Sequence, residues 1–190
     1  AAALRERWAA ITGAGRVTPI DWDAETIQAG GVTVLHGDCA ARNKEPVLLN
    51  TLTALMQGGR EQVVVQTPYI ICNRAMYDAL EKAGGAAQVQ IITNAPQRGA
   101  NPWGCADYLN QKKAILSTGV SVCEWHGERS MHTKTILIDD RFSIIGSFNW
   151  DMRSAYLDTE LMLLVDCPEL NAALRAETDE MVRQGRLLLP

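Results

Sequence analysis

The stretch MHTKTILIDDRFSIIGSFNW, residues 131–150, sets polar side chains of chemically useful types among apolar and β-branched ones. If HTKTILID forms a strand, its side chains alternate between two faces, which places His132 and Lys134 on the same face. Asp139 then lies on the opposite face, and we expect it to hold the structure together without reacting. An imidazole and an ammonium group would thus be presented together at one end of an apolar strand.

Three further polar side chains complete this group. In GSFN, Ser147 and Asn149 are two positions apart and share a face if the chain is extended, and Gly146 would let the backbone approach a ligand closely. Glu160 lies in the apolar stretch LDTELMLLV, where an unpaired carboxylate is costly to bury. We therefore expect a cationic or donor-rich partner for it. His132 is the candidate, because a carboxylate on one imidazole nitrogen leaves the other free to act as nucleophile or base.

A phosphodiester anion is the substrate that suits such a group. The imidazole would attack phosphorus, while Lys134 and Asn149 would hold the nonbridging oxygens and stabilise the charge of the transition state. This chemistry requires no metal, and the sequence shows no evident set of metal ligands. We therefore expect neither a metal nor another cofactor.

The spacing H-x-K-x4-D-x6-G-S-x-N, from His132 to Asn149, resembles the HKD motif of the phospholipase D superfamily. The glutamate in NWDMRSAYLDTE also resembles that family. The likeness extends more loosely to VVVQTPYI, VQIITNAP and the helix before GVSVCEW, which covers residues 33–182. These segments are similar to the second catalytic half of bacterial cardiolipin synthases.

The resemblance implies a mechanism in which two such motifs face one cleft. One histidine attacks phosphorus to form a phosphohistidine, and the other protonates the leaving alcohol and then activates water or an acceptor alcohol. Ser147 would support the site by hydrogen bonding, and Glu160 would orient His132. The implied catalytic set is His132, Lys134, Asp139 and Glu160, and the implied phosphate-binding set is Lys134, Ser147 and Asn149.

The motif occurs once, because neither HGD at His36 nor HGE at His126 is H-x-K, and His132 is the only other histidine. Two arrangements remain open. The chain is either the C-terminal half of a longer two-motif enzyme or a single-motif protein that completes its cleft as a homodimer. In both arrangements the partner that completes the cleft is a second domain with an HKD motif, either the missing N-terminal domain of the same chain or a second copy in a homodimer. We assign residues 1–32 to a linker or the remnant of a preceding domain, and residues 33–190 to the catalytic domain.

The elements that must position these residues follow from hydrophobic periodicity. Residues 1–45 read as an irregular connection with a short N-terminal helix. Helices are predicted at 45–59, 73–85, 106–119 and 168–185, and strands at 62–69, 89–93, 120–125 and 158–166, with two more inside 131–150. This alternation predicts an α/β fold, a three-layer α/β/α sandwich whose mixed sheet is partly antiparallel. It would form one half of a phospholipase D-type pseudo-dimer. Tyr69 either lines the mouth of the pocket or packs inside.

Composition narrows the classes of substrate and partner that we expect. The 190 residues carry 18 basic and 22 acidic side chains, a net charge of −4 without a basic stripe, so we do not expect nucleic acid as a partner. The expected substrate is a phospholipid or another phosphodiester, hydrolysed or transferred without metal. A homodimeric phosphodiesterase or nuclease is one alternative, and a non-catalytic domain that binds phosphate or a head group is another.

Location is predicted from two further features. No apolar run reaches the roughly 18–20 residues that span a bilayer. The five scattered cysteines contain no C-x-x-C pair, which indicates reduced thiols. We expect a cytoplasmic protein that lies peripherally at the inner membrane surface, held there by the longer parent protein of which it would be a part.

Overall fold

The computed structural model describes residues 2–13, 21, 26–99 and 101–190. Its strands are β1 (Gly31–His36), β2 (Gln62–Gln66), β3 (Ile70–Ile71), β4 (Gln88–Asn94), β5 (Ser121–Trp125), β6 (Thr135–Ile138), β7 (Phe142–Gly146), β8 (Trp150–Asp151), β9 (Leu161–Asp166) and β10 (Arg186–Leu188). Its helices are α1 (Ala2–Gly13), α2 (Val47–Gln57), α3 (Arg74–Gly84), α4 (Pro102–Leu116), α5 (Met152–Tyr156) and α6 (Pro168–Gln184).

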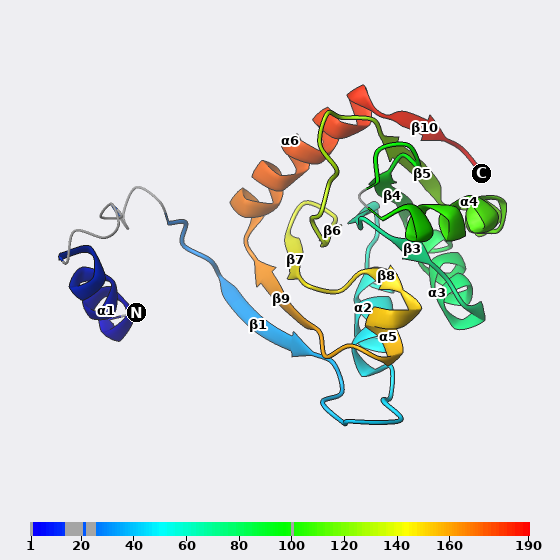
Figure 1. The fold of residues 1–190 in the computed structure, drawn as a ribbon. Helices are drawn as coiled ribbons and strands as arrows, with labels where there is room; N and C mark the ends of the chain where they lie inside the picture. The colour runs from blue at the N-terminus through cyan, green and yellow to red at the C-terminus, as the bar shows by residue number, and fades with distance from the viewer. Residues whose placement is uncertain (1, 14–20, 22–25, 100) are drawn as a thin grey trace.

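Eight of these strands form one mixed sheet in the order β1-β9-β7-β6-β2-β4-β5-β10 (Figure 1). Strands β2, β4 and β5 are parallel, and the remaining pairs are antiparallel. Strands β3 and β8 form a separate two-stranded parallel sheet. The predicted mixed, partly antiparallel sheet is therefore confirmed.

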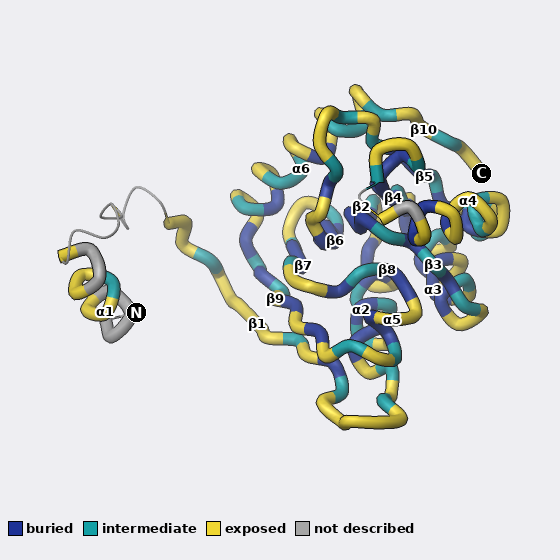
Figure 2. The backbone as a smooth tube through the Cα atoms, viewed as in Figure 1, coloured by how far each residue is buried: buried dark blue, intermediate teal, exposed yellow. Residues whose placement is uncertain are grey.

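Helices cover both faces of the sheet, because each strand of its centre is apolar on both sides. Helices α2, α3 and α4 share a core with Val63 and Val65 of β2. Helix α6 packs over Val64 and Leu137 on the opposite face. In Figure 2 the central strands are accordingly buried, whereas β1 at one side is largely exposed. The α/β/α sandwich expected from the sequence is confirmed.

Local sequence accounts for the helix boundaries. Leucines 48, 49 and 52 and Met56 recur with the helical period in α2 and are all buried. Helix α3 begins after Asn73, whose side-chain oxygen accepts a hydrogen bond of 3.0 Å from the Met76 amide and so caps the helix.

One element departs from the prediction. Residues 1–45 contain the expected N-terminal helix, but Gly31–His36 form strand β1, which is paired antiparallel with β9. The irregular interpretation of this stretch is therefore wrong. A local pattern gave little sign of it, because β1 is an edge strand with an almost wholly exposed surface and its partner lies far along the chain.

Several strands begin or end at the same end of the sheet. Strands β2, β4, β5 and β7 end there, and the antiparallel strands β6 and β9 begin there. We call this the carboxyl end of the sheet. Polar residues that flank these strands at that end are thereby brought close together.

Two further observations concern the whole of the described chain. None of the described helices is both long enough and apolar enough to span a membrane. All five cysteines lie in the described part; each is a free thiol, and four of them are buried.

Candidate active site

His132 and Lys134 lie on the segment that leads into β6, at the carboxyl end of the sheet. The strand itself starts only at Thr135, so the H-T-K triplet precedes the ladder and is not part of it. His132 is exposed, whereas Lys134 is 8% exposed. The Lys134 ammonium lies 3.0 Å from His132 Nδ1 and donates to the His132 carbonyl oxygen at 2.8 Å. The two side chains predicted to act together are thus adjacent.

Burial and neighbouring charges shift the pKa of Lys134 in opposite directions. Burial lowers the pKa of Lys134, because a desolvated ammonium is costly. The carboxylates of Glu160 and Asp151 oppose that effect by favouring the charged form. The site therefore pairs a buried cation with two carboxylates and an exposed imidazole.

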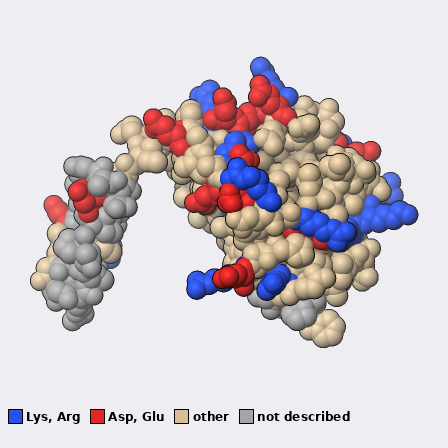
Figure 3. All heavy atoms as spheres, turned by 90° about the horizontal axis from the view of Figure 1, so that it is seen from above, with Lys and Arg blue, Asp and Glu red and all other residues tan. Residues whose placement is uncertain are grey.

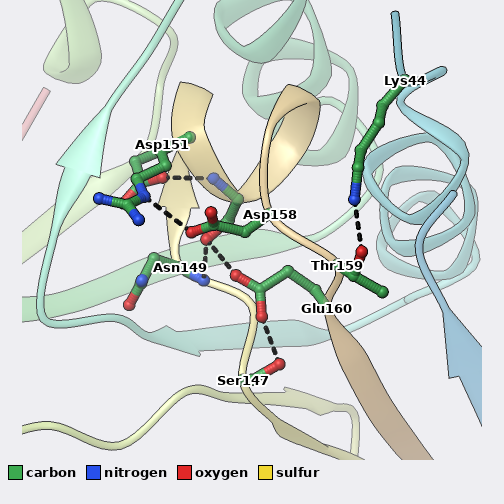
Figure 4. Close-up of polar contacts among 9 residues, drawn as sticks. Lys44, Ser147, Asn149, Asp151, Asp158, Thr159 and Glu160 are labelled. Atoms are coloured by element: carbon green, nitrogen blue, oxygen red, sulfur yellow. Dashed lines mark hydrogen bonds and ion pairs between the residues drawn. The ribbon is translucent and has the colours of Figure 1, made fainter. Parts of the chain in front are cut away.

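Glu160 is bound by two serine hydroxyls (Figure 4). Ser147 donates to one carboxylate oxygen, and Ser154 donates to the other at 2.6 Å. A donor-rich partner was expected, but the specific expectation that His132 would be that partner is not met. Within the described residues no hydrogen bond joins Glu160 to His132, since the hydroxyls occupy the carboxylate and the imidazole faces Lys134.

Ser147 and Asn149 follow β7 at the same end of the sheet. The Ser147 hydroxyl is engaged within the protein, because it donates to Glu160 and accepts from the Leu161 amide at 3.0 Å. The Asn149 amide N–H donates to Ser154 Oγ at 3.1 Å, but its side-chain Oδ1 is buried without a hydrogen-bond partner. A buried amide oxygen without a partner is uncommon in native proteins.

A hollow of about 560 Å³ opens beside Asn149. Tyr69, Trp103 and Leu157 line it together with charged residues, and Trp103 is 83% exposed. The Tyr69 ring meets the His132 ring edge-on, with 6.2 Å between centroids. Tyr69 therefore lines this hollow and contacts the His132 ring, whereas His132 and Lys134 are not among the residues that line the hollow. A second hollow of about 640 Å³ lies at the opposite end of the sheet, around residues 84–90, away from these side chains.

Asp139 lies at the other end of β6, with the whole strand between it and Lys134. Its carboxylate accepts hydrogen bonds of 2.9–3.2 Å from the backbone amides of Arg60, Glu61 and Gln62. Burial raises the pKa of Asp139, but these donors together outweigh it and hold the pKa below its ordinary value. This placement fits the structural role expected from strand alternation and leaves Asp139 out of reach of the catalytic set.

Sequence reasoning missed two residues that organise the site. Thr67 accepts a hydrogen bond of 3.0 Å from the Trp150 amide and donates one of 2.7 Å to the Tyr69 carbonyl, so one hydroxyl joins two segments of the pocket. Asp151 caps α5 by accepting from the Ser154 amide at 2.8 Å, and burial raises its pKa. The D-x-x-S spacing after Trp150 was a usable capping signal, whereas nothing local marked Thr67.

Known proteins resemble this chain in sequence. A family model described as "Cardiolipin synthase, PLD-like domain" matches residues 52–182. Cardiolipin synthase A of Salmonella arizonae is 26% identical over 197 residues, which cover 93% of this chain and 39% of that protein. The chain thus spans about two-fifths of the length of the curated relatives that it matches.

Solved structures share its fold. Nuc, a phospholipase D family member from Salmonella typhimurium, has a TM-score of 0.66 at 17% identity, covering 84% of this chain and 100% of Nuc. Phosphatidylserine synthase of Haemophilus influenzae has a TM-score of 0.61 at 22% identity, covering 83% of this chain and 40% of that protein. At these identities the likeness concerns the fold alone. The family match, which spans more than half of the chain, decides the assignment: this chain belongs to the phospholipase D superfamily.

Proposed function

We propose that this chain is one catalytic half of a metal-independent phosphodiester hydrolase or phosphatidyltransferase that acts on phospholipids. In this proposal it is the C-terminal half of a cardiolipin synthase-like enzyme. The observation that carries the proposal is the exposed His132 imidazole beside the buried Lys134 ammonium, at the end of the sheet where Asn149 lines a hollow.

The reaction begins when a ring nitrogen of His132 attacks phosphorus. A P–N bond forms, the bond from phosphorus to the leaving alcohol breaks, and a histidine of the second half protonates that alcohol. The same histidine then deprotonates water or an acceptor alcohol, whose oxygen displaces His132. Lys134 and the side-chain amide of Asn149 donate to the nonbridging oxygens, where charge accumulates in each transition state.

Glu160 acts through Lys134 in this scheme. Its two serine donors hold the carboxylate in place, and its charge favours the protonated ammonium that a phosphate needs. In this scheme Ser147 holds Glu160 and has a positioning role, because its one hydroxyl hydrogen goes to that carboxylate and not to the phosphate.

A phospholipid suits the charge distribution better than nucleic acid does. Acidic and basic side chains are interspersed on the face seen in Figure 3, and the net charge is −4. Proteins that bind nucleic acid mainly through phosphates usually gather Lys and Arg into a patch. The exposed apolar rim of the hollow, which includes Trp103 and Leu157, also favours a lipid substrate.

The second half has two candidate sources. Cardiolipin synthase A is more than twice as long as the segment matched here, so it has room for two units of this size. Nuc, in contrast, is matched over its whole length by a single unit. The fold is compatible with both arrangements.

The test is hydrolysis of a chromogenic phosphodiester, and of phospholipid vesicles, with chelator present and over a series of protein concentrations. Activity per chain that rises with concentration would mean that two copies of His132 complete one cleft. Silence at every concentration would place the partner histidine in another domain, and the assay would then be repeated with a parent protein that contains it.

In the active assembly, His132→Ala should abolish turnover while the circular dichroism spectrum stays unchanged, and the chelator should have no effect. His126→Ala removes an exposed histidine outside the motif and should leave turnover intact. Substantial activity in His132→Ala would refute the proposal.

A further inference from the structure

The backbone that carries His132 lies outside the strand ladder. The β6 pairing with β2 begins at Thr135, and the described strand pairs do not include residues 131–134. On its C-terminal side this segment is anchored, since the Lys134 carbonyl accepts from the Gly146 amide at 3.2 Å. A nucleophile on such a segment needs an anchor on its N-terminal side too, because effective attack requires a well-defined position.

Asn94 supplies that second anchor. Its side-chain nitrogen donates to the Met131 carbonyl oxygen at 2.9 Å, and its side-chain oxygen accepts from the Met131 amide at 2.8 Å. The carboxamide thus makes with Met131 the paired hydrogen bonds that two residues exchange in an antiparallel ladder. Met131 directly precedes His132, so the pair of bonds ends one residue before the imidazole.

The position of Asn94 makes this anchor rigid. It is the last residue of β4, which lies between β2 and β5 inside the sheet, and it is 2% exposed. The next residue, Ala95, continues the ladder by donating to the Trp125 carbonyl at 2.9 Å. Buried, fully satisfied polar contacts of this kind favour a single arrangement over alternatives.

We propose that Asn94 is a positioning residue for His132. By holding Met131 it fixes where the imidazole stands relative to the Tyr69 ring and the Lys134 ammonium. The catalytic consequence rests on the function proposed above, in which His132 attacks phosphorus. The positional consequence does not, so the two are tested separately.

Asn171 offers a matched control. It is also a buried asparagine, 0% exposed, and its side-chain nitrogen donates to the Phe142 carbonyl at 2.8 Å. Phe142 begins β7 at the end of the sheet opposite to His132. Asn171→Ala therefore removes a comparable buried amide contact without touching the segment before β6.

The first readout is the nuclear magnetic resonance spectrum of the imidazoles in the full chain. Only three histidines are present, so His36 and His126 serve as internal references. In Asn94→Ala we expect the His132 resonances to move or broaden while the other two stay in place. In Asn171→Ala, at similar loss of thermal stability, all three should remain unchanged.

The second readout is kinetic, in the assembly that shows turnover. Asn94→Ala should lower kcat on the order of 10- to 100-fold, the effect of misplacing a reacting group by about an ångström, with little change in KM. Asn171→Ala should leave kcat within about twofold of the unmodified protein. Equal kinetic losses in both variants would reduce Asn94 to a residue of general stability and overturn the proposal.

Two further measurements cover the case in which Asn94→Ala does not fold. In the unmodified chain the Met131 amide should exchange with solvent slowly, as a buried donor does, and fast exchange would contradict the proposed anchor. Asn94→Asp keeps the acceptor for that amide but loses the donor, so we expect a smaller displacement of His132. An unchanged His132 position in this variant would contradict the proposal. If His132 moves in these variants while His132→Ala retains turnover, the anchor stands and the proposed function fails.

Discussion

Replacing Asp139 by Asn tests whether this member of the motif stabilises the fold or takes part in catalysis. The carboxylate receives backbone amides from three successive residues, Arg60 to Gln62. A hydrogen bond to a charged group contributes about 1.5–3 kcal/mol, but the amide of the variant still accepts and the site is half-buried. We therefore expect a loss of about 1–2 kcal/mol of unfolding free energy. For a chain of this size that corresponds to a drop of about 2–8 °C in Tm.

The effect should depend on pH with a definite sign. The folded-state pKa of Asp139 lies below its ordinary value of 3.8, so its charge stabilises the fold fully above that value. This contribution is lost as pH falls through the folded-state pKa. The difference in unfolding free energy between the unmodified chain and Asp139→Asn should thus be widest at neutral pH and shrink below about pH 4.

Urea denaturation followed by circular dichroism, at several values from pH 7 to pH 3, measures this difference. Asp140→Asn is the matched control, because it removes the charge of the adjacent, exposed carboxylate. It should change stability by no more than about 0.5 kcal/mol. An Asp139→Asn variant of unchanged stability that has lost turnover would refute the structural role and return Asp139 to the catalytic set.

Two other substitutions test contacts at the carboxyl end of the sheet. Gly146→Ala would place a Cβ 2.1 Å from the Leu161 carbonyl oxygen, so β7 and β9 must separate. We expect a loss of about 3 kcal/mol of unfolding free energy, measured by urea denaturation. Gly31→Ala is the control and should cost far less, because a Cβ there meets nothing within 4 Å. A stable Gly146→Ala would show that this close approach does not exist. Thr67→Val keeps the side-chain shape but deprives two backbone groups of their partner, so we expect a loss of about 2–3 kcal/mol together with reduced turnover. Thr51→Val, which removes a solvent-exposed hydrogen bond to the Val47 carbonyl, is its control, and equal losses in the two threonine variants would contradict the role given to Thr67.

The sequence predicted those features that local patterns encode. The valine-rich run of β2 and the motif from His132 to Asn149 each carry their own periodicity or spacing. Together they yielded the α/β/α class and the adjacent imidazole and ammonium groups. The alternation argument placed Asp139 on the face opposite to His132, whereas in the structure the length of β6 separates it from Lys134.

Contacts that depend on tertiary packing could not be predicted from the sequence. Ser154 binds Glu160 from α5, the helix that Asp151 caps, and the position of that helix next to the carboxylate is a tertiary feature. Asn94 fell just outside the predicted strand 89–93, and its partner Met131 lies 37 positions away. Strand β1 was missed for the same reason, because pairing with β9 rather than its own composition makes it a strand.

The strand order has a consequence for the path by which the site is assembled. Strands β2, β4 and β5 join through local crossovers into one unit, and β6, β7 and β9 join through short connections into another. Within the large sheet the two units meet at the antiparallel pairing of β2 with β6, and the pairings of β3 with β8 and of β10 with β5 join them further. Such distant pairings close late because loop-closure entropy opposes them. Tyr69 and Asn94 belong to the first unit, and His132 and Asn149 to the second. A chain that had folded both units without joining them would contain every residue of the motif and still have no active site.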